Sequence, residues 1–167
     1  MKTNTDKVIE ILQSYRSKKR MIQQLEFELQ NPSQISATEL LRAMSIGGAG
    51  YSTVHSGGIS DKTMSVVAHY SDTADRLNIE TLEEIKRELR VLEIETSKLE
   101  LYVSLLDERQ ARIIRLRDFE GKSWNYLEAE LKMSERRLRA HRMAGIAELA
   151  SMFGFIETIK RNKHNEE

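Results

Sequence analysis

The chain contains no cysteine, a single proline and few aromatic residues, which make up 6% of its 167 residues. The absence of cysteine excludes disulfide bonds and thiolate zinc sites, and it fits a reducing compartment. Few prolines and aromatic residues, combined with 31% charged residues, favour long helices over sheets. We therefore expect an all-α protein.

An excess of charge of one sign is also missing, because 26 Lys and Arg residues balance 26 Asp and Glu residues. The whole molecule therefore does not attract a polyanion, and a nucleic-acid site requires local clustering of positive charge. No run of about 18 apolar residues is long enough for a membrane span, and the N-terminal sequence lacks the apolar core of a signal peptide. We expect a soluble protein in the cytoplasm, without a membrane partner.

Two amphipathic patterns dominate residues 1–106. Between Asp6 and about Gln30, apolar residues recur at steps of three and four, and Pro32 predicts the end of this helix at Asn31. The apolar positions of this first helix are Val8, Ile11, Tyr15, Ile22, Leu25 and Leu29. A second stripe follows heptad spacing through Leu82, Ile85, Leu89, Leu92, Thr96, Leu99, Val103 and Leu106. The first helix, folded back antiparallel, or a second protomer in a homodimer would cover this stripe.

The segment between these patterns contains "SATELLRAM", which predicts an additional turn of helix, and then a glycine-rich stretch at about 45–60. We expect that stretch to be a flexible connection, with Ser60 capping the next helix. That helix should run unbroken, although "TLEE" at Thr81 is a possible capping box, so a break between Asn78 and Thr81 is the alternative.

Nothing in the sequence indicates an enzyme. The "GKS" at 121–123 lacks the preceding glycine of a P-loop, because Leu116 occupies that position, and the four histidines lack metal-ligand spacing. We expect no catalytic residue, no cofactor and no metal.

Residues 107–154 show three short helical patterns with clear boundaries. "DERQARIIRLRDFEG" predicts a helix that ends at Gly121, Ser123 then caps "WNYLEAEL", and after a break at Lys132 and Met133 a third helix begins with Ser134 as its cap. The residues expected inside are Ile113, Ile114, Leu116, Phe119, Trp124, Leu127, Leu131, Leu138, Ile146 and Leu149. Three such helices predict a tri-helical helix-turn-helix domain, followed by a C-terminal tail at 155–167.

The outward face of the third helix is rich in arginine and contains a single acid, Glu135, beside Arg136, Arg137, Arg139 and Arg142. A planar guanidinium can pair with guanine O6 and N7 or clamp a phosphate. Most charge runs form a solvated helix face, so the arginines predict double-stranded DNA as the partner of this helix only in combination with the three-helix pattern and the resemblance of the whole segment to a DNA-binding domain.

The stretch "LLDERQARIIRLRDFEGKSWNYLEAELKMSERRLRAHRMAGIAEL" resembles region 4 of bacterial sigma factors. Together with the helical N-terminal half and "HSGGISDKT" at 55–63, it resembles the ArpU/RinA-type late transcriptional regulators of phages. This resemblance implies a helical hairpin joined to a sigma-like helix-turn-helix, and activation of phage or prophage genes in a bacterial host cell. It places Glu135, Arg136, Arg137, Arg139 and Ala140 near bases or phosphates, and it places Lys122, Ser123 and Lys132 at the DNA backbone.

One position departs from the family pattern, because Glu128 stands where a small residue normally lets the second helix approach the recognition helix. Glu128 could reach solvent or Arg137, or the two helices could pack at a changed angle. RNA polymerase is an additional partner that the resemblance suggests. The alternatives are a small terminase-like subunit for DNA packaging and a structural coiled-coil protein that binds no DNA.

Overall fold

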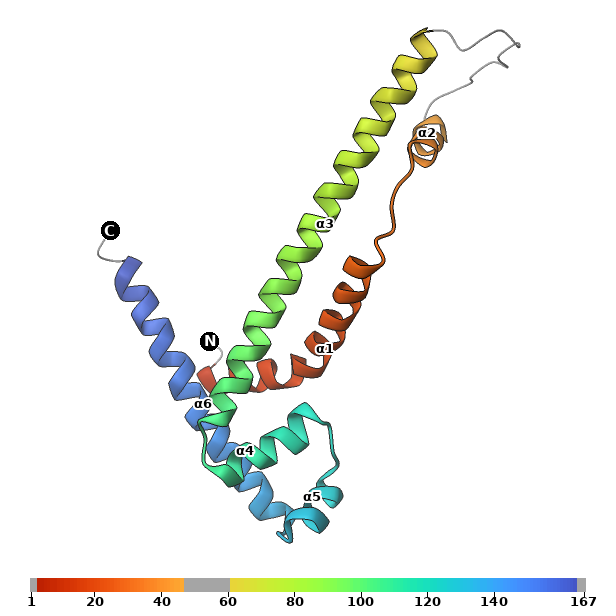
Figure 1. The fold of residues 1–167 in the computed structure, drawn as a ribbon. Coiled ribbons are helices and arrows are strands. Elements are labelled where there is room, and N and C mark those ends of the chain that lie inside the picture. The colour runs from red at the N-terminus through yellow and green to blue at the C-terminus, as the bar shows by residue number, and fades with distance from the viewer. Residues whose placement is uncertain (1–2, 47–60, 165–167) are drawn as a thin grey trace. The chain divides into compact units, whose positions relative to one another are not determined.

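The structure, a computed structural model, describes residues 3–46 and 61–164, which form helices joined by short connections (Figure 1). These described residues contain no β-strand, so the all-α prediction is confirmed. Residues 47–60, which include most of the predicted glycine-rich connection and its Ser60 cap, lie outside the described residues. The elements are α1 (Asn4–Gln30), α2 (Ala37–Ile46), α3 (Asp61–Ser104), α4 (Glu108–Ile114), the π-helical turn η1 (Arg115–Phe119), α5 (Trp124–Leu131) and α6 (Glu135–His164).

The helix boundaries of the N-terminal half follow from local sequence. α1 ends at Gln30, close to the predicted end before Pro32, and α2 confirms the additional helical turn. Ser36 and Glu39 form a capping box at the start of α2: the Glu39 carboxylate accepts the Ser36 N–H at 2.9 Å, and the Ser36 hydroxyl accepts the Glu39 N–H at 3.2 Å. These hydrogen bonds lower the pKa of Glu39.

α3 is one continuous helix of 44 residues, so the alternative break between Asn78 and Thr81 is not found. Thr81 is an interior residue, and its hydroxyl donates to the carbonyl of Leu77 at 2.8 Å. In the described residues, no helix combines the length and the apolar character needed to cross a lipid bilayer.

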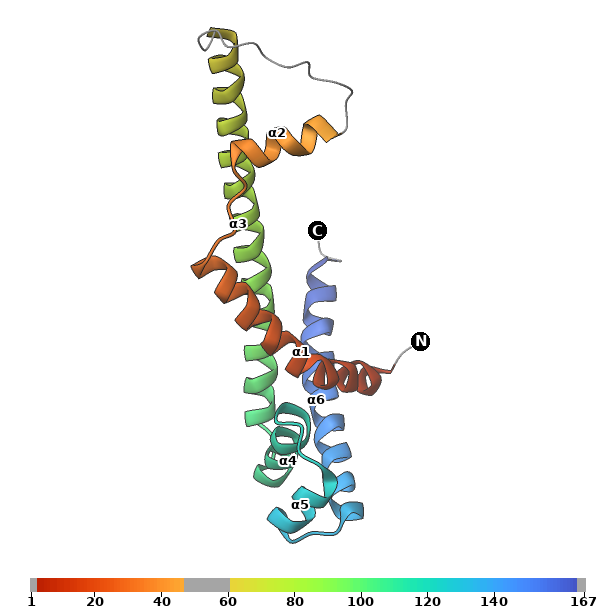
Figure 2. The same cartoon turned by 90° about the vertical axis from the view of Figure 1, so that its right-hand side faces the viewer.

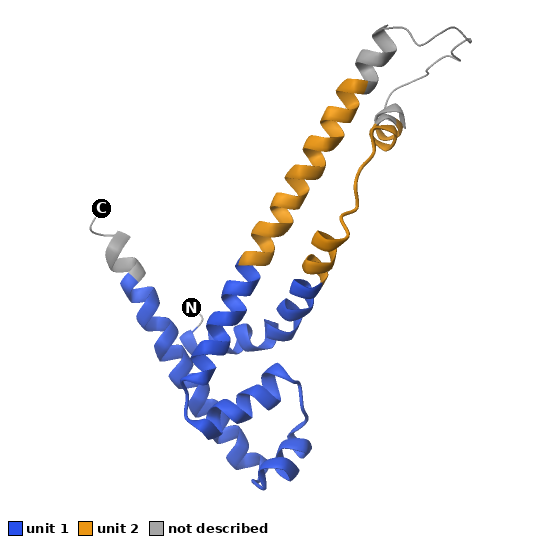
Figure 3. Ribbon diagram, viewed as in Figure 1, with its two compact units in different colours: residues 1–23, 91–167 blue, residues 24–90 orange. Residues whose placement is uncertain are grey.

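The chain divides into two compact units (Figure 3). Unit 1 comprises Met1–Gln23 and Val91–Glu167, and unit 2 comprises Gln24–Arg90. Within unit 2, the Asn78 side chain pairs with the backbone of Ile35, donating to its carbonyl at 3.0 Å and accepting its N–H at 2.9 Å. This pair joins the segment before α2 to the middle of α3.

In unit 1, the first part of α1 runs antiparallel to the last part of α3. The Tyr15 hydroxyl donates to Glu100 at 2.6 Å, and Lys18 pairs with Glu95 at 2.8 Å, so later residues of α1 meet earlier residues of α3. The buried core of this unit contains Val8, Leu12, Tyr15, Leu99, Val103, Leu106, Ala111, Ile114, Ile146, Leu149 and Ala150. Within unit 1, α1 therefore covers part of the predicted heptad stripe. Of the adjacent residues Ile11 and Leu12, Leu12 is buried in this core and Ile11, the predicted stripe position, is only partly buried.

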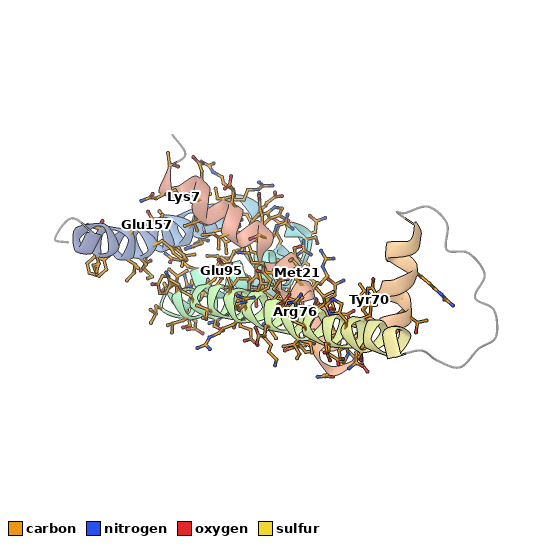
Figure 4. The ribbon with its side chains drawn as sticks, turned by 90° about the horizontal axis from the view of Figure 1, so that it is seen from above. Lys7, Met21, Tyr70, Arg76, Glu95 and Glu157 are labelled. Atoms are coloured by element: carbon orange, nitrogen blue, oxygen red, sulfur yellow. The ribbon has the colours of Figure 1, made fainter. Side chains whose placement is uncertain are left out.

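The core of unit 1 extends across position 106, the predicted domain boundary, because residues of α1 and α3 pack with residues of α4 and α6 (Figure 2). The ring of Tyr15 stacks on Phe119 with centroids 3.9 Å apart. At the surface, Lys7 of α1 lies 3.5 Å from Glu157 of α6 (Figure 4). α6 continues to His164, so it includes most of the residues assigned to a C-terminal tail.

Candidate nucleic-acid interface

α4, α5 and α6 share a small apolar core that orients the candidate interface. Ile113, Leu127 and Leu138 are fully buried against one another. Leu116, Trp124, Leu131 and Met133 are partly buried and pack around them. The inward positions predicted for these three helices are therefore buried or partly buried. The first helix differs from its prediction, because its last residues, Arg115–Phe119, form a wider π-helical turn.

The connection from η1 to α5 is built as the sequence predicts. Gly121 has a φ of +74°, a conformation that favours glycine, and the Arg16 guanidinium lies against it. A Cβ at this position would only displace that guanidinium, so the positive φ is the main reason for glycine here. Ser123 then caps α5, since its hydroxyl accepts the N–H of Tyr126 at 3.2 Å.

The turn between α5 and α6 depends on Lys132 and Glu128. Lys132 adopts a left-handed conformation with a φ of 51°, which ends α5. The Glu128 carboxylate accepts the N–H of Glu135, the first residue of α6, at 2.6 Å. Glu128 is thus a cap for α6, a role that sequence analysis did not assign. Ser134 directly precedes α6 as predicted, and its carbonyl accepts the Leu138 N–H at 3.0 Å.

Most of the predicted DNA-contacting side chains lie at the surface. Arg136, Arg137, Arg139 and Ala140 of α6 are exposed, as are Ser123, Lys132 and Ser134, whereas Lys122 and Glu135 are half-buried. Arg139 is oriented by two contacts. Its Nε donates to Glu135 at 2.7 Å, and its guanidinium lies 4.8 Å from the centroid of the Trp124 ring.

Arg142 lies elsewhere, because its guanidinium forms a bidentate pair with Asp118 of η1. Its Nε and Nη2 donate to the two carboxylate oxygens at 2.9 and 2.6 Å. The Arg142 and Asp118 side chains are only 17% and 8% exposed. The structure therefore separates Arg142 from the exposed arginines and gives it a contact that joins α6 to η1.

Arg117 is a positively charged residue near this surface that sequence analysis did not select. Its guanidinium lies 4.8 Å from the Trp124 centroid, and its Nη1 donates to the carbonyl of Lys122 at 2.7 Å. The Lys122 ammonium lies 5.1 Å from the ring of Tyr126. The positive side chains of η1, the following turn and α6 therefore gather around the start of α5. No periodic pattern indicates Arg117, because the grouping depends on the tertiary contact with Trp124.

Among the side chains that the structure describes, no group of His, Asp and Glu is arranged to hold a metal ion. Comparisons of this chain with protein-family models, with curated proteins and with solved structures found no match.

Proposed function

We propose that this protein is a sequence-specific DNA-binding transcriptional regulator, an activator of phage or prophage genes, in which α5 and α6 act as a sigma region 4-like helix-turn-helix. One observation carries the proposal: Arg136 and Arg137 are exposed in the first turn of α6, while Leu138, the next residue, is fully buried. The same turn is thus anchored in the core and presents two guanidinium groups outward. A recognition helix uses residues in this position to reach base edges in the major groove.

The chemistry at the start of α6 favours readout by side chains. A free helix N-terminus attracts a phosphate through its unpaired N–H groups. Here the Glu128 carboxylate already accepts the first N–H of α6, and Glu135 adds a second negative charge. The exposed arginines are therefore the groups that would attract DNA, and the two glutamates would discourage phosphates from docking at the helix end.

The surrounding side chains supply complementary contacts in this proposal. Lys122, Lys132 and Arg117 would bind phosphates, because they lie in η1 and in the turns before α5 and α6, outside the first turn of the recognition helix. Arg139 would be preorganised by Glu135 and Trp124, which lowers the entropy lost when its remaining donors bind DNA. The N-terminal helical hairpin would serve dimerisation or contact with RNA polymerase.

The test is selection of DNA sites from a random pool, followed by binding isotherms on selected and scrambled duplexes. Arg136→Ala and Arg137→Ala are compared with Arg87→Ala, which removes the same charge from an exposed position on α3. We expect at least one α6 variant to lose about 1–3 kcal/mol on the selected site and much less on scrambled DNA. Lys122→Ala should weaken both duplexes similarly and lower the log–log salt slope by about one unit.

Arg87→Ala should leave both affinities unchanged. The proposal is wrong if no sequence is enriched, or if the triple replacement of Arg136, Arg137 and Arg139 binds the selected duplex as tightly as the natural chain. Either result would instead favour a structural role for the helices.

A further inference from the structure

α3 and the turn that follows it carry a second apolar stripe that is exposed in unit 1. The large apolar side chains of this stripe are Val91, Ile94, Leu101 and Leu105, with exposed fractions of 49%, 59%, 56% and 61%. Leu101 follows the buried Leu99 by two residues, which is about 200° around an α-helix, so the two stripes lie on opposite sides of α3. α1 and the C-terminal helices bury the first stripe and leave this one uncovered within the unit.

The exposed residues follow coiled-coil spacing. With Lys98 included, the stripe advances by three and four residues in alternation: Val91, Ile94, Lys98, Leu101 and Leu105. In heptad notation, Val91, Lys98 and Leu105 occupy a positions, and Ile94 and Leu101 occupy d positions. Side chains with this spacing can pack between the a and d side chains of a second helix.

We propose that this stripe is the seam of a parallel, two-stranded coiled coil between two copies of this chain. Charge complementarity identifies a second copy in parallel orientation. In that arrangement a g residue faces the e residue five positions later in the other helix, which pairs Arg90 of each copy with Glu95 of the other. Glu95 also pairs with Lys18 of its own chain, but its side chain is half exposed and so can accept from a second cation. An antiparallel pair centred on the same stripe would set Glu95 against Tyr102 and lose both ion pairs.

Lys98 is compatible with this seam because its ammonium group points away from the stripe, toward the rings of Tyr102 and Phe153. Its ammonium lies 5.1 Å from the centroid of Phe153 and 5.4 Å from that of Tyr102, so the aliphatic part of the side chain is what the stripe presents. A single lysine at an a position lowers the stability of a coiled coil and selects its register and oligomeric state. The lysine therefore favours one alignment of the two helices.

The seam is short, and its length predicts a weak dimer. From Val91 to Leu101, the last stripe residue within α3, the helix rises about 15 Å, so the contact lies at or below the roughly 1,200 Å² at the lower end of specific interfaces. α3 is already held by α1 in each copy, so association does not have to order an isolated helix. We expect a dissociation constant in the micromolar range.

Sedimentation equilibrium of the full chain without DNA tests the proposal. The natural chain should convert from monomer to dimer as its concentration rises through the micromolar range. The double variant Ile94→Glu/Leu101→Glu should remain monomeric at concentrations at least tenfold higher, with an unchanged helical circular dichroism spectrum, because both side chains are exposed in the single chain. Ser151→Glu is the matched control, since it adds a carboxylate to an exposed position of α6, away from the seam.

Orientation is tested by charge exchange. Arg90→Glu should weaken association about two- to fivefold by placing like charges together. Arg90→Glu/Glu95→Arg/Lys18→Glu should restore it, because the third change keeps an ion pair between position 95 and α1 of the same chain. A natural chain that stays monomeric at several hundred micromolar would overturn the proposal and would leave the stripe to a different protein. A dimer that persists in Ile94→Glu/Leu101→Glu would place the interface elsewhere, and failed charge restoration would exclude the parallel seam.

This inference is independent of the proposed function. The variant that lacks Arg136, Arg137 and Arg139 should dimerise like the natural chain whether or not the natural chain binds DNA. Conversely, Ile94→Glu/Leu101→Glu should retain the affinity of a single chain for one DNA half-site. Two linked copies would bind two half-sites as one unit, which is how dimeric helix-turn-helix regulators gain affinity for symmetric sites.

Discussion

Removing one partner of the Arg142–Asp118 pair should destabilise unit 1 strongly, whereas replacing both should not. The two side chains are 17% and 8% exposed, so a single substitution leaves its partner charged and largely out of water. Breaking a fully buried pair costs about 3–5 kcal/mol, and the partial exposure of Arg142 lets water reach its guanidinium, so we expect about 2–4 kcal/mol. Both Asp118→Leu and Arg142→Met should show this loss.

The double variant Asp118→Leu/Arg142→Met should recover most of the stability, because an apolar pair of similar volume needs no desolvated charge. Urea unfolding followed by far-UV circular dichroism measures all three free energies and yields the coupling between the two positions. Glu130→Leu is the control. It removes the Arg112–Glu130 pair, whose atoms are 2.9 Å apart but whose side chains are 55% and 43% exposed, and it should cost about 1 kcal/mol or less.

Two results would refute this reasoning. If Asp118→Leu changed stability no more than Glu130→Leu does, the pair would not be a buried contact in solution. If Arg142→Met abolished specific DNA binding while stability stayed unchanged, Arg142 would contact DNA directly, as the sequence pattern suggested. Stability and DNA affinity must therefore be measured on the same variants.

Three further predictions concern other contacts of unit 1. Glu128→Ala removes the acceptor of the first N–H of α6 and should lower the free energy of unfolding by about 0.5–2 kcal/mol, measured by urea unfolding; an unchanged value would show that this cap is not formed. Gly145→Leu should destabilise by about 1–3 kcal/mol, because even a Cβ at this position lies 3.0 Å from Ile114 Cδ1; a variant with unchanged thermal melting would contradict the close approach of α6 and α4. Burial, together with the Glu100 carboxylate, raises the pKa of Tyr15 above its ordinary value. Below about pH 10, Tyr15 is protonated in both the folded and the unfolded chain, so its ionisation does not affect stability. Above about pH 10 the unfolded chain ionises first, so the free energy of unfolding falls as the pH rises. Tyr15→Phe should flatten this loss between about pH 9.5 and 11, and equal slopes for both chains would refute the prediction.

The sequence predicted elements well where a repeating pattern or a local boundary residue determines them. The heptad positions Leu92, Leu99 and Val103 are buried, and Ser123 caps α5, because each depends on spacing within one segment. The prediction that Ile11 is a main core position of α1 was wrong. Ile11 and Leu12 are adjacent apolar residues, and only the packing of α1 in unit 1 selects Leu12 as the more buried one.

Contacts between distant residues could not be predicted from one sequence. Arg142 and Asp118 are 24 positions apart, and an arginine that pairs internally has the same local pattern as one that faces solvent. Glu128 caps α6 from the preceding helix, so the usual inspection of the residue before the helix does not find it. The DNA-binding roles of Arg136, Arg137 and Arg139 stay predictions, since exposure alone does not identify what a side chain binds.

The left-handed conformation of Lys132 has a consequence for how this position should vary among related chains. A non-glycine residue pays about 1–2 kcal/mol for this backbone geometry, and glycine or asparagine would relieve much of the strain. If stability of the fold were the only property under selection, related chains should therefore carry glycine or asparagine at this position. If related chains keep a lysine or arginine at this turn despite the conformational penalty, the positive charge itself must be under selection. That evidence would not depend on the arginines of α6.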